Sequence, residues 1–148
     1  PAPGARRSDR NLSQRRKGRE VTENELGKMI VDAALTVHRA LGPGLLESVY
    51  EGALAHELTI RGLGVRRQVP MSVRYKGVEF EEGFRADLVV EDKVLVEIKS
   101  VETFHNAHKK QVLTYLKLSG RKLGFLINFG EELLKNGIVR IVNGLQEN

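Results

Sequence analysis

Hydrophobic residues recur every three or four positions in two stretches near the start of the chain, which is the spacing of an amphipathic helix. The first stretch covers residues 26–41 and follows Thr22 and Glu25, a pair with the spacing of a capping box. The segment Leu41-Gly42-Pro43-Gly44 ends this helix, because glycine terminates a helix and proline cannot continue it. The second stretch runs from about Leu46 to Arg61 and is followed by two glycines. Two helices are therefore expected before the first strand.

The next part of the chain alternates between apolar and polar residues and is broken by turn residues, a pattern typical of strands. The predicted strands cover 65–69, 71–75, 78–81, 84–90 and 94–99, and together they indicate an antiparallel meander. A helix at 106–118 and strands at 122–129 and 138–142 complete the chain. This order predicts an α/β or α+β fold, with a mixed central β-sheet flanked by helices.

Charged residues divide the chain into two unequal parts. The net charge is +5 at pH 7, and residues 1–20 hold seven basic residues against two acidic residues. The remainder is neutral overall, so the sequence pI of about 9.6 describes the first part alone. Residues 1–20 also have no hydrophobic periodicity and cannot bury enough surface to become ordered. We therefore expect a basic, disordered tail at 1–20 and a single domain at 21–148.

Three interpretations of the tail remain open. It is a solvated segment, an Arg-rich targeting peptide, or an arm that contacts phosphate groups. In the last case, the nucleic-acid-binding residues are Arg6, Arg7, Arg15, Arg16 and Lys17.

Cysteine is absent, which excludes disulfides, Cys-ligated zinc, iron–sulfur clusters and thiol nucleophiles. Its absence fits a cytoplasmic protein. No apolar run approaches the roughly 20 residues that a membrane-spanning helix requires, so no membrane partner is expected.

Polar residues interrupt two of the predicted strands, at Asp87 and at Glu97 and Lys99. Strand side chains alternate between faces, so Glu97 and Lys99 share one face. A hairpin between these strands brings Asp87 close to Glu97. Two adjacent carboxylates repel each other unless a divalent cation or a proton lies between them.

This arrangement suits the chemistry of phosphodiester cleavage. Mg²⁺ or Mn²⁺ prefers oxygen ligands, which Asp87, Glu97 and the carbonyl of Ile98 supply. A bound divalent ion activates water, and Lys99 then positions that water or stabilises negative charge. The alternative is that Glu97 and Lys99 form an exposed polar face with a cross-strand ion pair.

Residues on the predicted helices add to the candidate site. Gln111 and Tyr115 are spaced i, i+4 and share a helix face, where they can reach the same edge of the sheet. The alternative is that Tyr115 belongs to the core and Gln111 is its solvated neighbour. Glu47 lies at the start of the second helix and is either a metal ligand or a residue favoured by the helix dipole.

Three further residues are second-tier candidates. Tyr50 shares a helix face with Glu47, and His38 and His108 each lie on a helix near the candidate groups. A single histidine is more often structural than catalytic.

The segment Gly44-x-x-Glu47-x-x-Tyr50 resembles the signature of the GxxExxY protein family, a branch of the PD-(D/E)XK nuclease-like superfamily. The resemblance extends from about Glu25 to Gly144. Further matching segments are Leu41-Gly42-Pro43-Gly44, Arg85-Ala86-Asp87, Glu97-Ile98-Lys99, His108, residues 111–116 and residues 126–130.

The resemblance implies a restriction-endonuclease-like core in which Asp87 and Glu97 hold Mg²⁺ and Lys99 is the third core residue. Gln111 and Tyr115 resemble the Q-x-x-x-Y element of the exonuclease branch. In that branch a helix glutamate joins the metal site, and Glu47 occupies the matching position. The superfamily proline that precedes the aspartate is replaced here by Ala86, which puts little in doubt because that proline ligates nothing.

The expected function is therefore hydrolysis of phosphodiester bonds in nucleic acid, with DNA as the favoured substrate, by a Mg²⁺-activated water. The alternative is a nucleic-acid-binding or assembly module that retains the fold without cutting. A small-molecule metalloenzyme is a third interpretation, although no specificity pocket is evident. Because a duplex has two strands, a homodimer is also expected.

Overall fold

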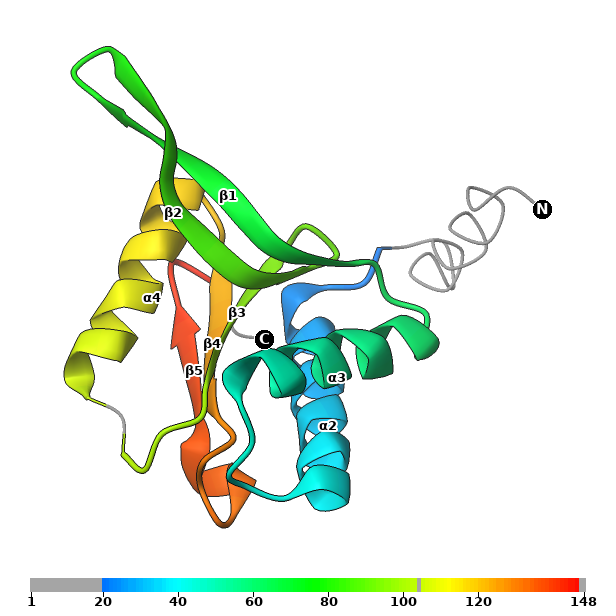
Figure 1. Ribbon diagram of the computed structural model, residues 1–148. Helices are drawn as coiled ribbons and strands as arrows, with labels where there is room; N and C mark the ends of the chain where they lie inside the picture. The colour runs from blue at the N-terminus through cyan, green and yellow to red at the C-terminus, as the bar shows by residue number, and fades with distance from the viewer. Residues whose placement is uncertain (1–19, 104, 147–148) are drawn as a thin grey trace.

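A computed structural model describes residues 20–103 and 105–146 of the chain, which form a sheet with helices on both sides (Figure 1). The helices are α2 (Glu23–Leu41), α3 (Glu47–Ile60), α4 (Asn106–Ser119) and the 3₁₀ helix η2 (Leu134–Gly137). The strands are β1 (Val65–Tyr75), β2 (Val78–Val90), β3 (Val94–Lys99), β4 (Leu123–Asn128) and β5 (Ile138–Val142). No helix within these ranges is both long and apolar enough to span a membrane.

The five strands form one sheet in the order β1-β2-β3-β4-β5. Strands β3 and β4 are parallel, and every other neighbouring pair in this sheet is antiparallel. Helix α4 connects β3 to β4, as the crossover between parallel neighbours requires. The prediction of a mixed central sheet flanked by helices is confirmed, and β1 to β3 form the predicted antiparallel meander.

The sheet separates two apolar cores. Helices α2 and α3 cover one face and α4 covers the other (Figure 1). Alternation along β3 sends Val94 and Val96 into the core beneath α2 and α3, and Leu95 into the core beneath α4. Every β3 residue except Lys99 is buried. A charged side chain on this strand therefore lies in largely apolar surroundings.

The start of α2 follows the sequence pattern closely. The Thr22 side chain accepts a hydrogen bond from the Glu25 backbone, and the Glu25 side chain accepts one from the Thr22 backbone. These reciprocal bonds satisfy amides at the helix start that have no partner within the helix. The predicted capping box is confirmed, and the helix ends at Leu41 as predicted.

The β1–β2 hairpin differs from its prediction. The sequence predicted a break at Pro70, but β1 continues through it as a single strand. Proline is tolerated because β1 is an edge strand. Strand β2 is also continuous across Gly83, where a Cβ atom would lie 2.1 Å from the Val73 side chain. Residues 72–83, here called the arm, project well beyond the rest of the sheet (Figure 1).

Candidate active site

The two central carboxylates meet where the pairing between β2 and β3 ends. The last paired residues on this side are Leu88 and Val96, after which the strands diverge. The Asp87 backbone N–H donates to Glu97 Oε2 at 2.8 Å, and the Ile98 backbone N–H donates to Asp87 Oδ2 at 2.8 Å. Each carboxylate is therefore fixed by the backbone of the opposite strand. We call this place the fork.

Burial makes the negative charge of both carboxylates unfavourable. Glu97 is only 6% exposed, and its pKa is raised to about 8 by burial and by the charge of Asp87. The pKa of Asp87 is also raised, mainly by burial and further by Glu51, although its bond from the Ile98 amide opposes this shift. Two carboxylates in this state are stabilised by a shared proton or by a cation.

Lys99 provides positive charge beside the fork. It is half-buried, follows Glu97 on the same face of β3, and its charge lowers the pKa of both Asp87 and Glu97. No salt bridge joins Lys99 to either carboxylate among the residues that the structure describes. Its ammonium group therefore influences both carboxylates electrostatically without forming an ion pair with either.

Helix α4 brings Tyr115 to the fork. Burial raises the pKa of the Tyr115 phenol, and the charges of Glu97 and Asp87 raise it further. The Tyr115 ring stacks on Phe84, with ring centroids 4.0 Å apart. Gln111 lies one turn earlier and is exposed. Tyr115 thus packs against Phe84 and also lies near the two carboxylates. The sequence offered these as alternatives, a core residue or a residue of the candidate site, and the structure combines them.

The helix carboxylate most strongly linked to the fork is Glu51. It is 7% exposed, and its charge raises the pKa of both Asp87 and Glu97. The sequence pointed instead to Glu47, one turn earlier on the same face of α3. Glu47 is exposed and accepts a 3.4 Å hydrogen bond from the Ser100 backbone, on the Lys99 side of the fork. The sequence signal for Glu51 was its spacing of four residues from Glu47, which places both carboxylates on one face of the helix.

Gln68 of β1 was also missed from the sequence. Its Nε2 group donates to Glu51 Oε1 at 2.6 Å and to Asp87 Oδ1 at 3.2 Å. The other oxygen of Glu51 accepts from Arg67 Nε at 3.1 Å. A glutamine in a strand of alternating polarity gives no sequence signal for such a bridge.

The second-tier candidates occupy different environments. His38 Nε2 is 2.8 Å from the Glu131 carbonyl oxygen, and the Tyr50 ring stacks on Phe129 at 4.6 Å. The structure therefore places both in the packing of the domain. His108 Nδ1 accepts from the His105 backbone at 3.3 Å, and its pKa is lowered by burial and by the nearby charge of Lys99. His108 is thus the member of this group that faces the fork.

The donor set at the fork fits Mg²⁺. Within residues 20–103 and 105–146, no three His, Asp or Glu side chains form a ready-made metal cage. Mg²⁺ does not require one, because it retains several waters and is usually held by one or two carboxylates. Asp87, Glu97 and the carbonyl of Ile98 supply hard oxygen donors. Within the part of the chain that the structure describes, no ion-pair partner of Asp87 or Glu97 competes with a cation.

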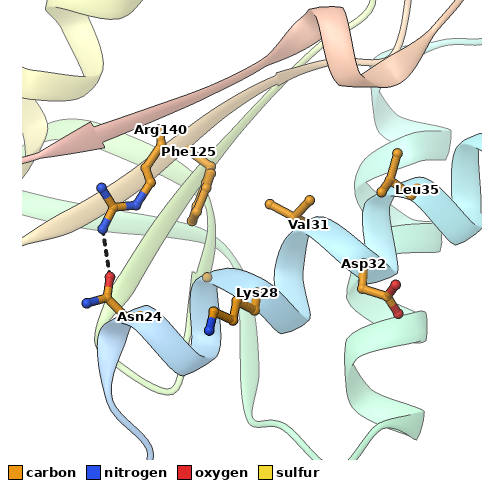
Figure 2. Close-up of a pocket in the computed structure, with 8 residues that line it drawn as sticks. Asn24, Lys28, Val31, Asp32, Leu35, Phe125 and Arg140 are labelled. Atoms are coloured by element: carbon orange, nitrogen blue, oxygen red, sulfur yellow. Dashed lines mark hydrogen bonds between the residues drawn. The ribbon is translucent and has the colours of Figure 1, made fainter. Parts of the chain in front are cut away.

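A cavity of about 540 Å³ lies elsewhere, between α2 and strands β4 and β5 (Figure 2). Arg140 Nη2 donates to Asn24 Oδ1 across its mouth at 2.6 Å. The carboxylate in its lining is Asp32, which is paired with Arg61 at 2.6 Å. This cavity lacks the adjacent carboxylates of the fork, so the candidate chemistry belongs to the fork.

The basic residues predicted to bind nucleic acid, Arg6, Arg7, Arg15, Arg16 and Lys17, lie outside the described residues.

Comparison with known proteins adds two findings. A family model described as the PD-(D/E)XK nuclease superfamily matches residues 24–141. The crystal structure of SSO0001 is similar in fold, with a TM-score of 0.51 and 19% sequence identity over 80% of this chain. The match covers 59% of the SSO0001 chain. No curated protein gives a significant match.

Proposed function

This chain belongs to the PD-(D/E)XK nuclease superfamily, and from this we propose that it hydrolyses phosphodiester bonds of nucleic acid, with DNA as the substrate and Mg²⁺ as the cofactor. The observation that carries the proposal is the pair of adjacent carboxylates, half-buried Asp87 and buried Glu97, each bonded to the backbone of the other's strand. Mn²⁺ is expected to substitute for Mg²⁺, since it also prefers oxygen ligands.

In this proposal Asp87, Glu97 and the Ile98 carbonyl hold the metal. When bound, Mg²⁺ lowers the pKa of a water molecule and stabilises negative charge on the phosphate. Lys99 places its ammonium group beside the same space, where it orients the attacking water and stabilises the charge that develops. The pKa values of the carboxylates, raised without a cation, fall when a cation occupies the fork.

Two further residues line the proposed path of the substrate. Tyr115 presents its phenol beside the carboxylates, and exposed Gln111 lies one helical turn away on the same side of α4. Their hydroxyl and amide groups orient the phosphate backbone by hydrogen bonding. Glu47 approaches from the opposite side, near His108 and Lys99. We retain Glu47 as an additional ligand, bound directly or through water.

The geometry around Tyr50 supports placing the chain in the GxxExxY branch. The Tyr50 hydroxyl donates to the Gly42 carbonyl and accepts from the Leu45 backbone at 3.1 Å. These bonds fix the loop that contains Gly44, whose φ of 102° suits glycine. The glycine and tyrosine of the motif thus fix the start of α3 and direct Glu47 and Glu51 to the fork. A homodimer that presents two forks to a duplex completes the proposal.

The test is calorimetric titration of Mn²⁺ into the wild-type chain and into Asp87→Asn, followed by a cleavage assay of each on DNA and RNA. We expect the substitution to abolish Mn²⁺ binding and metal-dependent cleavage together. Asp92→Asn is the matched control, because Asp92 is exposed on the β2–β3 turn and pairs with Arg66 and Arg121. Full cleavage by Asp87→Asn contradicts the proposal, and preferred cleavage of RNA corrects the substrate.

A further inference from the structure

Gln68 adopts a backbone conformation that its strand does not explain. Its φ is 50°, in the left-handed region, although it lies inside β1. The neighbouring residues are paired normally, Arg67 with Leu88 and Val69 with Ala86. A residue with a Cβ atom adopts this conformation only with steric strain. Such strain persists only where the surroundings fix it, and it is concentrated at functional sites.

The left-handed turn directs the Gln68 side chain to the fork. The same amide nitrogen donates to Glu51 on α3 and to Asp87 on β2. Glu51 belongs to a helix and Asp87 to a strand, and the two residues are 36 positions apart in the chain. Gln68 is therefore the side chain through which α3 is connected to the Asp87 carboxylate.

An amide suits this position better than a charged donor. It offers two N–H groups, so one side chain can serve two carboxylates. Because it is neutral, it holds them close together and leaves the negative charge of Asp87 available to a cation. A lysine or arginine in the same place would neutralise that charge. Arg67, the cationic partner of Glu51, is half-exposed and bonds to the oxygen that Gln68 does not contact.

Resting on the proposed function, we infer that Gln68 is a positioning residue that, held by Glu51, fixes the Asp87 carboxylate in the orientation that binds the divalent metal. The left-handed backbone at Gln68 is the local cost of that arrangement. Loss of a hydrogen-bond partner behind a metal ligand typically weakens metal affinity by roughly 10–100-fold. Replacement of Gln68 by glycine should therefore lower metal affinity without lowering fold stability.

The experiment compares Mn²⁺ affinity and metal-free thermal stability in the wild type, Gln68→Gly and Gln68→Asn. Glycine relieves the backbone strain and removes the amide, so the melting temperature holds or rises while Mn²⁺ affinity falls about 10–100-fold. Asparagine tolerates the left-handed backbone but is one carbon too short to reach both carboxylates, so we expect a similar loss of affinity. The matched control is Lys76→Gly, an exposed position in the arm with φ 47°, where the same backbone relief should leave Mn²⁺ affinity unchanged.

The outcomes separate this inference from the proposed function. Wild-type binding of Mn²⁺ that Asp87→Asn abolishes supports the metal site itself. If Gln68→Gly then binds Mn²⁺ within twofold of the wild type, the positioning role is wrong and the metal site stands. If the wild type does not bind Mn²⁺, the proposed function and this inference are both overturned.

Discussion

The two halves of β2 depart from the usual distribution of side chains in opposite ways. One half turns a carboxylate toward the interior, and the other half exposes apolar side chains to solvent. Its inner half, residues 84–90, carries the half-buried Asp87 beside the buried Glu97 of β3. Its outer half forms one side of the arm, where Val78 is 56% exposed and Phe80 is 52% exposed. A single strand thus places a half-buried charge next to the core at one end and exposed apolar groups at the other. Isolated surface hydrophobic residues are ordinary, whereas a buried charge calls for an explanation.

The difference shows which end of the strand is built for chemistry. On the arm, Val73 pairs with Phe80 and Tyr75 pairs with Val78, so these four residues share one face of the hairpin. Their exposure has little energetic consequence for the folded chain. At the fork, by contrast, ionisation of the buried Glu97 beside the half-buried Asp87 opposes folding, and this cost persists unless a ligand offsets it. Substitutions should therefore change the free energies of unfolding, metal binding and catalysis strongly at the fork and weakly on the arm.

The largest contrast is expected between two lysines. Lys99→Met should lower the cleavage rate by about 100–1,000-fold, because it removes a charge that stabilises the transition state. Mn²⁺ affinity should be unchanged or slightly stronger, since the ammonium group repels the cation. Lys76→Met, on the arm, should leave both quantities unchanged. Single-turnover cleavage and calorimetry measure the two effects, and a parallel loss of Mn²⁺ affinity in Lys99→Met would mean that Lys99 supports the ligands instead.

The second contrast concerns pH. The pKa of Glu97 is raised from 4.5 to about 8 in the folded chain, so the folded state keeps a proton that the unfolded state has released. Without metal, the contribution of Glu97 to the free energy of unfolding should be greatest below pH 4.5 and should fall as pH rises toward 8, by on the order of a few kcal/mol. Urea unfolding in a chelating buffer measures this. Glu97→Gln should remove most of the dependence, whereas Glu81→Gln on the arm should retain it. Stability that rises through this window would contradict the assignment.

The smallest contrast uses two phenylalanines of the same strand. Phe84 is 8% exposed and stacks on Tyr115, whereas Phe80 is half-exposed on the arm. Phe84→Ala should lower the free energy of unfolding by about 3 kcal/mol. Phe80→Ala should change it by less than about 1 kcal/mol, as surface substitutions usually do. Urea unfolding compares the two, and equal losses would show that the arm is covered by a partner in solution.

Local patterns in the sequence were sufficient to predict the regular elements. The strand Ile138–Val142 has the predicted bounds, and the helix that follows Thr22 has the predicted cap and end. Each depends on neighbours within a few residues. The break predicted at Pro70 is wrong because the sequence does not show whether a strand lies at an edge, where proline is tolerated.

The candidate site was predictable only in part, for a related reason. The adjacency of Asp87 and Glu97 followed from a hairpin between strands that are neighbours in the chain. The roles of Glu51 and Gln68 depend on how α3 and β1 pack on that hairpin. Periodicity carries no information on such contacts. It also does not reveal that one glutamine adopts a left-handed backbone.

The irregular backbone of β1 also bears on whether this edge of the sheet can pair with a further strand. An edge strand exposes a row of backbone N–H and C=O groups that can template pairing with another molecule, which is a common origin of aggregation. On β1 this row is broken by the reversed backbone of Gln68, and Pro70 removes one N–H altogether. Because these features lie two residues apart, they make the β1 edge a poor template for a sixth strand. The irregularity that shapes the fork therefore also protects this edge of the sheet.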